Sequence, residues 1–287
     1  MGLKKYAVFW LLLLRSNHPI MMKKAILFWS CLLLLAGKMA MAQESSPQSW
    51  HHNLFVGVSP KFLPNHSPNL EHFRPEGGYG STIYVKSKIN NTQYSVCYEL
   101  LSPDQQWGFS TGVQYTQYWK QIGYDALDPD EIHTMTVPDY YLFEIQNDDN
   151  QLEYMRIRGI EQHSYYMGIP LEVRRYITFG SLTTFRILFM AETDFDFLVG
   201  NMNQVNFIND AMVPFAEQIS SNYDNPSPLL ASAYLGSGIQ FKNHHGFGVN
   251  FNWLIHLGDF CGSTGLLKQD SGCGGIKLQF KILIPLK

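Results

Sequence analysis

The stretch GFGVNFNWLIHLG, residues 246–258, decides the fold. Successive side chains of a β-strand point to opposite faces. Read in this way, the stretch has an apolar, aromatic face and a mostly small and polar face. The first consists of Phe247, Val249, Phe251, Trp253, Ile255 and Leu257, and the second of Gly248, Asn250, Asn252, Leu254, His256 and Gly258. About ten residues of such alternation suffice for a tilted strand to cross a bilayer. The stretch therefore predicts a membrane-spanning strand.

The same alternation recurs in seven further segments. These are residues 53–62, 92–101, 107–120, 163–177, 185–199, 229–241 and 276–286. Long and short connections alternate between the eight segments. Outer-membrane barrels show the same alternation, with short periplasmic turns and longer external loops. We therefore predict an all-β fold, an eight-stranded antiparallel up-and-down transmembrane β-barrel with long extracellular loops. The longest of the predicted loops are about 121–162 and 200–228.

The composition of the two faces indicates which one meets lipid. Gly, Ser, Asn and Gln are frequent on the polar face, which suits the narrow interior of an eight-stranded barrel. Phe, Tyr and Trp are frequent towards the strand ends of the apolar face, as in interfacial girdles. We expect the apolar face to point outwards, with Arg175 as an exception at the periplasmic end. The alternative is a secreted soluble ligand-binding barrel, which would bury the same apolar face.

The first 42 residues have the features of a targeting segment. Lys23 and Lys24 precede an apolar run at 25–36, and an Ala-Met-Ala cleavage site follows at 40–42. An earlier apolar run at 6–14 suggests that translation starts at Met21 or Met22. We therefore predict a signal peptide region at 1–42 and a barrel domain at 43–287, located in the bacterial outer membrane.

Charge and cysteine content narrow the possible partners. Six of the 21 Lys and Arg residues, and none of the 24 acids, lie in the first 42 residues, so the remaining chain has a formal charge of −9. This acidity argues against a nucleic-acid partner. Outer-membrane lipid and other envelope proteins are the expected partners. Cys261 and Cys273 bracket one loop, and in an oxidising compartment they are candidates for a disulfide.

The charged residues on the polar face can be interpreted in two ways. They are Glu99, Glu172, Arg174, Arg186, Glu192, Asp194, Asp196, Lys277 and Lys281. The simpler reading is an internal ion-pair network that fills a closed barrel, which argues against an open channel. The second interpretation is a hydrolytic centre near the extracellular mouth. In it, Glu192, Asp194 and Asp196 lie beside His256, with Ser164 at a similar height. We favour the first, and predict no enzyme activity, cofactor or metal, because the chain has no compact catalytic motif.

The stretch Tyr166-Met167-Gly168-Ile169-Pro170-Leu171-Glu172-Val173 resembles the fourth strand of the PorT-like outer-membrane β-barrel family of Bacteroidetes-type bacteria. Strand order and loop lengths are similar as well, over residues 53–287. The resemblance implies an outer-membrane location, and some relatives serve in protein secretion across that membrane. The leading hypothesis is a non-catalytic envelope protein whose surface loops make contacts, as an accessory of secretion. An outer-membrane hydrolase that uses the cluster around His256 is the alternative.

Overall fold

The computed structural model describes residues 49–62, 66–68, 73–74, 87–123, 141–146, 152–178, 184–209, 213–214, 216–220, 225–263, 265, 267–269 and 275–286. The chain divides into two compact units, Met1–Ser49 and Trp50–Lys287. The signal peptide predicted at 1–42 lies outside the described residues, and so do both candidate start positions. They remain predictions.

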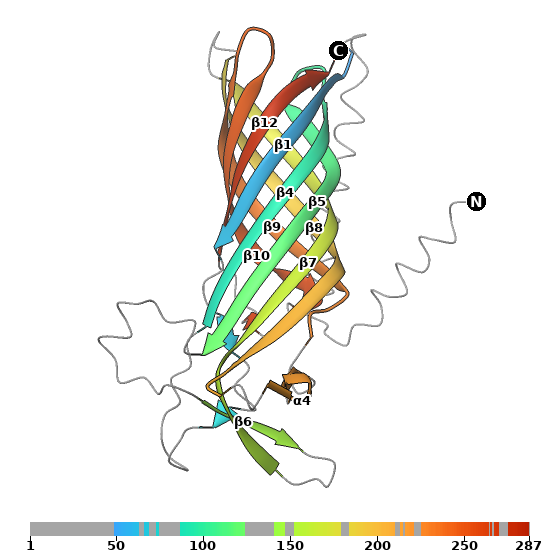
Figure 1. Ribbon diagram of the computed structural model, residues 1–287. Coiled ribbons are helices and arrows are strands. Elements are labelled where there is room, and N and C mark those ends of the chain that lie inside the picture. Colours follow the sequence, from blue (N-terminus) through green and yellow to red (C-terminus); the bar gives the residue numbers. More distant parts are fainter. Residues whose placement is uncertain are drawn as a thin grey trace, which may run out of the picture. The chain divides into compact units, whose positions relative to one another are not determined.

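Eight antiparallel strands close into a ring (Figure 1). They are β1 (His51–Phe62), β4 (Ser87–Leu101), β5 (Trp107–Gly123), β7 (Leu152–Thr178), β8 (Phe185–Phe207), β9 (Leu229–Lys242), β10 (Gly248–Cys261) and β12 (Ile276–Leu286). Each strand pairs with the next in this order, and β12 returns to β1, with Val56 opposite Ile282. The predicted fold class is confirmed.

The remaining short elements lie in the long connections. They are β2 (His66–Pro68), β3 (Phe73–Arg74), β6 (Tyr141–Gln146), β11 (Leu267–Gln269) and the helix α4 (Ala216–Ser220). β2 pairs with β11, while β6 pairs with the first part of β7 and also with β3. Within the described ranges, no helix is long and apolar enough to cross a membrane.

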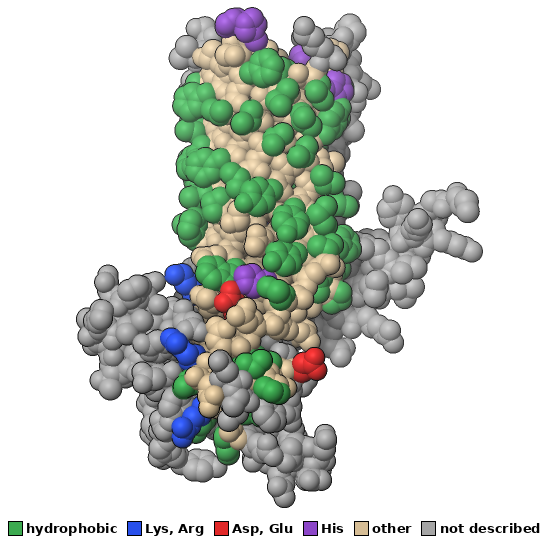
Figure 2. Space-filling view, viewed as in Figure 1, with side chains coloured by type: hydrophobic (Ala, Val, Ile, Leu, Met, Phe, Trp, Pro, Cys, Tyr) green, Lys and Arg blue, Asp and Glu red, His purple; other side chains and the backbone are tan. Residues whose placement is uncertain are grey.

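The polarity of the two faces is as predicted. Trp253 and Phe280 are 42% and 47% exposed, whereas Asn252 and Lys281, on the neighbouring positions, are 0% and 3% exposed. Figure 2 shows hydrophobic side chains over the whole visible wall of the barrel, with hardly any charge among them. Such a wall suits acyl chains and not water. The alternative of a soluble barrel requires the opposite arrangement, so the structure shows a transmembrane barrel.

The strands extend further on the extracellular side than predicted. β7 has 27 residues and β8 has 23, so the predicted loops at 121–162 and 200–228 are wrong over residues 121–123, 141–146, 152–162 and 200–207. The stacked pair Tyr115 and Tyr165 marks where the apolar wall ends on β5 and β7. Beyond this pair the outward residues of the two strands include Gln117, Gln121 and Glu161. There the polar residues face outwards.

A separate hydrophobic cluster fills this part of the molecule. It consists of Ile122, Phe143, Met155, Ile157, Ile160 and Ile219, with Ile89, Val205 and Phe207 packed against it. We call the described residues 87–91, 118–123, 141–146, 152–164, 200–207 and 216–220 the extracellular extension. The prediction failed here because the alternation continues with the faces exchanged: polar residues point outwards and apolar residues point inwards. This is the pattern of a water-soluble sheet. The barrel strands were identified by the opposite, lipid-facing pattern.

Candidate functional site

Ion pairs cross the lumen at its middle. Lys277 Nζ lies 2.8 Å from Asp194 Oδ2 and also pairs with Glu192. Lys61, which is paired with Lys277 in the β1–β12 ladder, approaches the same Asp194 oxygen with its Nζ at 3.3 Å. All of these side chains are buried. Because removal of one partner would leave a buried charge uncompensated, each member of the group depends strongly on the others.

A second set of pairs continues the network towards the periplasm. Arg174 binds Glu172, and its Nη1 lies 3.2 Å from Glu99 Oε1; Lys281 also pairs with Glu172. Glu99 accepts two further hydrogen bonds, from Tyr176 Oη at 2.6 Å and Asn53 Nδ2 at 2.8 Å. Every oxygen of Glu99 is thus engaged. The predicted internal ion-pair network is present, and it includes Lys61, which is not in the set of charges named from the sequence.

Large side chains close the remaining lumenal space. The ammonium groups of Lys277 and Lys61 lie 4.7 Å and 5.2 Å from the centre of the Tyr234 ring, and the Arg174 guanidinium lies 4.3 Å from that of Phe55. Cations stack favourably on such ring faces. Apolar residues including Leu188 and Leu254 also face inwards. Around these contacts the lumen is filled by side chains, as expected for eight strands.

The acids of the predicted cluster and the predicted histidine each have described hydrogen-bond partners. Glu192 and Asp194 are bound by lysines, and Asp196 accepts hydrogen bonds from Gln114 at 2.8 Å and Thr116 at 3.4 Å. His256 Nε2 instead lies 3.0 Å from Asp259 Oδ1.

A bulge in β10 explains this placement. Gly258 adopts a positive φ of 138° where the β9–β10 register shifts, and the shift brings Asp259 onto the inner face beside His256. Ser164 bonds Asn201 at 3.1 Å and takes no part in the acidic cluster. The Asp259 carboxylate that contacts His256 also accepts a hydrogen bond from Ser232 Oγ at 2.5 Å.

Three further histidines lie at the periplasmic end of the barrel. His51 contacts Gln105 at 3.3 Å, and His244 and His245 lie in the β9–β10 turn. In the part of the chain that the structure describes, no three His, Cys, Asp or Glu side chains are grouped to hold a metal. Cys261 ends β10, and Cys273 lies outside the described residues, so their disulfide remains a prediction.

A polar and aromatic band lies on β5 and β7 at the base of the extracellular extension. Trp119 stacks on His163 with 6.1 Å between ring centres, and both side chains bond Glu161, the histidine at 2.7 Å. Gln121 donates to the other oxygen of Glu161 at 3.3 Å. Aromatic rings with polar partners are typical of a membrane–water interface. The band therefore lies on the aqueous side of the interface, beyond the Tyr115–Tyr165 pair where the apolar wall ends.

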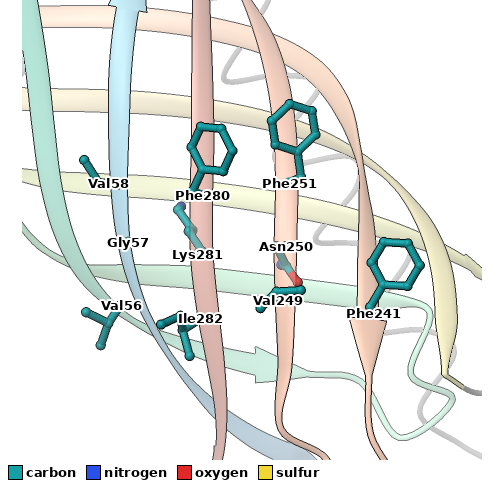
Figure 3. Close-up of a pocket in the computed structure, with 10 residues that line it drawn as sticks. All are labelled: Val56, Gly57, Val58, Phe241, Val249, Asn250, Phe251, Phe280, Lys281 and Ile282. Carbon is teal, nitrogen blue, oxygen red and sulfur yellow. The ribbon is translucent and has the colours of Figure 1, made fainter.

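An apolar hollow of about 550 Å³ lies on the outer wall (Figure 3). Phe251 and Phe280, whose ring centres are 4.9 Å apart, stand on one side of it, and Phe241 on another. Val56, Val249 and Ile282 complete the apolar lining. Since this surface belongs to the apolar wall, acyl chains of the bilayer are its neighbours.

Comparisons with known proteins place the chain in no family. No family model matches it, and no curated protein matches it. Among solved structures it is similar to the outer-membrane protein OprG from Pseudomonas aeruginosa, with 8% identity, a TM-score of 0.38 and coverage of 82% of this chain and 93% of that one. It is also similar to Ail, the attachment invasion locus protein of Yersinia pestis.

Two Ail structures match. The complex with the heparin analogue sucrose octasulfate has 9% identity, a TM-score of 0.31 and coverage of 83% of this chain and 97% of that one. The structure in a phospholipid bilayer nanodisc has 10% identity, a TM-score of 0.26 and coverage of 83% and 100%. The PorT-like resemblance remains a prediction. The fold assignment rests on the closed ring of strands and its apolar wall.

Proposed function

We propose that this protein is a non-catalytic integral protein of the bacterial outer membrane that uses its extracellular extension to contact other envelope components. The observation that carries the proposal is the closed eight-stranded ring with an apolar wall and a packed lumen. In bacteria, closed barrels of this kind are the form in which strands cross the outer membrane. The targeting segment predicted from the sequence supports the same location.

The lumen supports a role other than transport. Lys277, Asp194 and Lys61 join β12, β8 and β1 across it, and rings of tyrosine and phenylalanine pack on the cations. Opening a path for solutes would break buried ion pairs, which is strongly unfavourable. The activity of the protein is therefore expected on its surfaces and not through its centre.

The extracellular extension has the properties of a contact surface. Four strands of the barrel continue into it, so its backbone is held by the same hydrogen-bonded ladders as the transmembrane part. Its own hydrophobic cluster, which includes Phe143 and Ile219, packs β6 and α4 against these strands. A rigid platform of this kind loses little conformational entropy when a partner binds, which favours recognition.

Protein secretion is the specific process that we propose for these contacts. The support is the resemblance of residues 166–173 to the PorT-like family, some of whose members act in secretion across the outer membrane. In this role the extension would bind an envelope protein of the secretion apparatus. Deletion of residues 141–157, which removes β6 and the first part of β7, should then block export while the barrel still inserts.

Cell fractionation combined with gel mobility tests the proposal. The mature protein should be found in the outer-membrane fraction, need detergent for extraction, and change gel mobility when it is heated, because folded barrels resist SDS. It should also show no stepwise conductance in a planar bilayer. Recovery in the soluble fraction, or steady ion conductance, would contradict the proposal. Crosslinking at Gln121 or Gln204, on the outer face of the extension, would then identify the partner.

A further inference from the structure

A row of polar side chains crosses three strands between the ion-pair network and the periplasmic turns. Arg186 on β8 is paired with Gln240 on β9, and Gln240 with Asn250 on β10. The three side chains are 4%, 1% and 2% exposed. They therefore point into the lumen, near its periplasmic end.

These side chains have a large unmet capacity for hydrogen bonds. Arg186 Nε and Nη1 have no partner, and neither do the two polar atoms of the Gln240 amide or the two of the Asn250 amide. Four of these six atoms are nitrogen donors. Buried polar groups in folded proteins are nearly always satisfied, so an unmatched group of this size indicates that another molecule completes it.

The row also carries positive charge without a counter-charge. Arg186 has one hydrogen-bond partner among the described residues, the neutral side-chain amide of Gln105. Lys242, two residues beyond Gln240 on the same face of β9, is likewise without an ion pair in the described ranges. Arg174, by contrast, is paired with both Glu99 and Glu172. A buried cation needs such a partner to offset the loss of hydration.

Among the described residues, no lumenal carboxylate forms a direct ion pair with Arg186. Glu99 is fully occupied by Asn53, Arg174 and Tyr176. Asp196, which has no lysine or arginine partner in the described structure, lies beyond the ion-pair network towards the extracellular side. The sequence of the nearby β7–β8 turn, Phe-Gly-Ser-Leu-Thr at 179–183, contains no acid. A bound anion would give Arg186 the direct ion pair that these carboxylates do not form with it.

The entrance to this region is closed by an unusual turn residue. Gln105, in the β4–β5 turn, has a φ of 54° and is the non-glycine residue with a positive φ among those described. Its side chain accepts a hydrogen bond from Arg186 and contacts His51 at 3.3 Å. Such backbone conformations are rare outside glycine and often occur at functional positions.

We propose that Arg186, Gln240, Asn250 and Lys242 form a binding site for a phosphate-bearing anion at the periplasmic end of the lumen. The guanidinium and the lysine provide charge, and the amide nitrogens provide further donors. A hydrogen phosphate also carries a hydroxyl, which donates to the Gln240 or Asn250 carbonyl oxygen. Sulfate has no hydroxyl at neutral pH and so leaves these acceptors unmet. The site should therefore prefer phosphate to sulfate.

Phosphate binding to the full mature protein in detergent micelles tests this inference. Isothermal titration calorimetry with inorganic phosphate at pH 7 should show one saturable site, with at least tenfold weaker binding of sulfate. Arg186→Gln should weaken phosphate binding at least tenfold. Arg175→Gln is the matched control, because Arg175 lies at the same end of the barrel but stacks on Trp107 at 4.7 Å on the outer face. Its phosphate affinity should be unchanged.

Two further variants keep the test decisive. Gln105→Gly should raise the rate of phosphate association, since the side chain that covers Arg186 is removed while the positive φ suits glycine. Lys242→Gln should weaken binding, and it serves if Arg186→Gln fails to fold as judged by gel mobility. Absence of saturable binding in the wild type, or equal weakening by Arg175→Gln, would overturn the proposal.

Discussion

Gly168 on β7 faces Asp196 on β8, and a Cβ atom at Gly168 would collide with the Asp196 carboxylate. The backbone carbonyl oxygen of Phe195 lies only 2.7 Å from the same position. The carboxylate therefore reaches Gln114 and Thr116 only because its neighbour has no side chain. The pair shows how closely the lumenal packing depends on small residues in the strands that carry the charges.

Replacement of this glycine should destabilise the barrel. Gly168→Ala should lower the free energy of unfolding by about 1–3 kcal/mol, the range for a buried polar group that loses its partners. Urea unfolding in detergent micelles, followed by tryptophan fluorescence, measures the change. Gly200→Ala is the control, because a Cβ there meets only the Tyr165 ring at an ordinary 3.5 Å. Equal losses in the two variants would show that packing around Asp196 is not the cause.

Removal of the central lysine should have a larger effect. Lys277→Met leaves Glu192 and part of Asp194 without their cation, and we expect a loss of about 3–5 kcal/mol. The double variant Lys277→Met with Glu192→Gln should recover part of this loss, because one uncompensated charge is gone. Leu278→Met, at the adjacent outward position, should be nearly neutral. If the double variant is no more stable than the single one, the ion pair is not the source of the stability.

The lipid contact of the outer wall can be tested by placing an arginine at two positions of β5, one inside the apolar wall and one beyond it. Val113, which is 56% exposed, lies in the apolar wall, whereas Gln117 lies beyond the Tyr115–Tyr165 pair. Val113→Arg should cost ~2–4 kcal/mol of folding free energy in lipid and Gln117→Arg less than ~1 kcal/mol. Folding yield in vesicles, read from gel mobility without heating, reports the difference. Equal tolerance of both changes would mean that Val113 does not contact lipid.

Lys120 predicts a pH-dependent stability of the extracellular extension. Burial lowers the pKa of Lys120 to about 7, and the side chain bonds the Gln162 amide at 3.1 Å, beyond the membrane-spanning part of β5. Between pH 7 and its ordinary pKa of 10.5, the opened state binds a proton that the closed state lacks. The extension should therefore become more stable as the pH rises from 7 to 9.

Amide hydrogen exchange of Met155–Ile160 measures this effect, once the rates are corrected for the pH dependence of intrinsic exchange. Protection should increase with pH in the wild type. Lys120→Met, which cannot titrate, should give constant and higher protection. The same slope in both proteins would assign the pH dependence to another group.

The sequence predicted the barrel because lipid imposes a simple rule on every strand. Asn250, Asn252 and Lys277 had to point inwards for the same reason that Trp253 and Phe280 had to point outwards. The rule fails above the membrane, where Ile157 and Ile160 face inwards and Glu161 faces outwards. Sequence pattern gave the barrel strands but not the extension, because the outward solvent changes from lipid to water along a single strand.

The candidate site could be predicted only in part, because pairing depends on register and not on residue type. Arg174 and Arg186 lie on the same face in the same sequence pattern, yet one is paired with two carboxylates and the other with none. His256 was predicted beside the acids of β8, but a one-residue bulge at Gly258 gives it Asp259 as a partner. Neither difference leaves a signal in the spacing of the residues.

The hydrogen bonds between β1 and β12 have a consequence for biogenesis. These strands are separated by most of the chain, so the sheet keeps two unpaired edges until residues 276–286 have crossed the inner membrane. Throughout export, the aromatic wall and both edges would be open to aggregation in the aqueous periplasm. The chain is thus expected to need a periplasmic chaperone until β12 has been exported and has paired with β1.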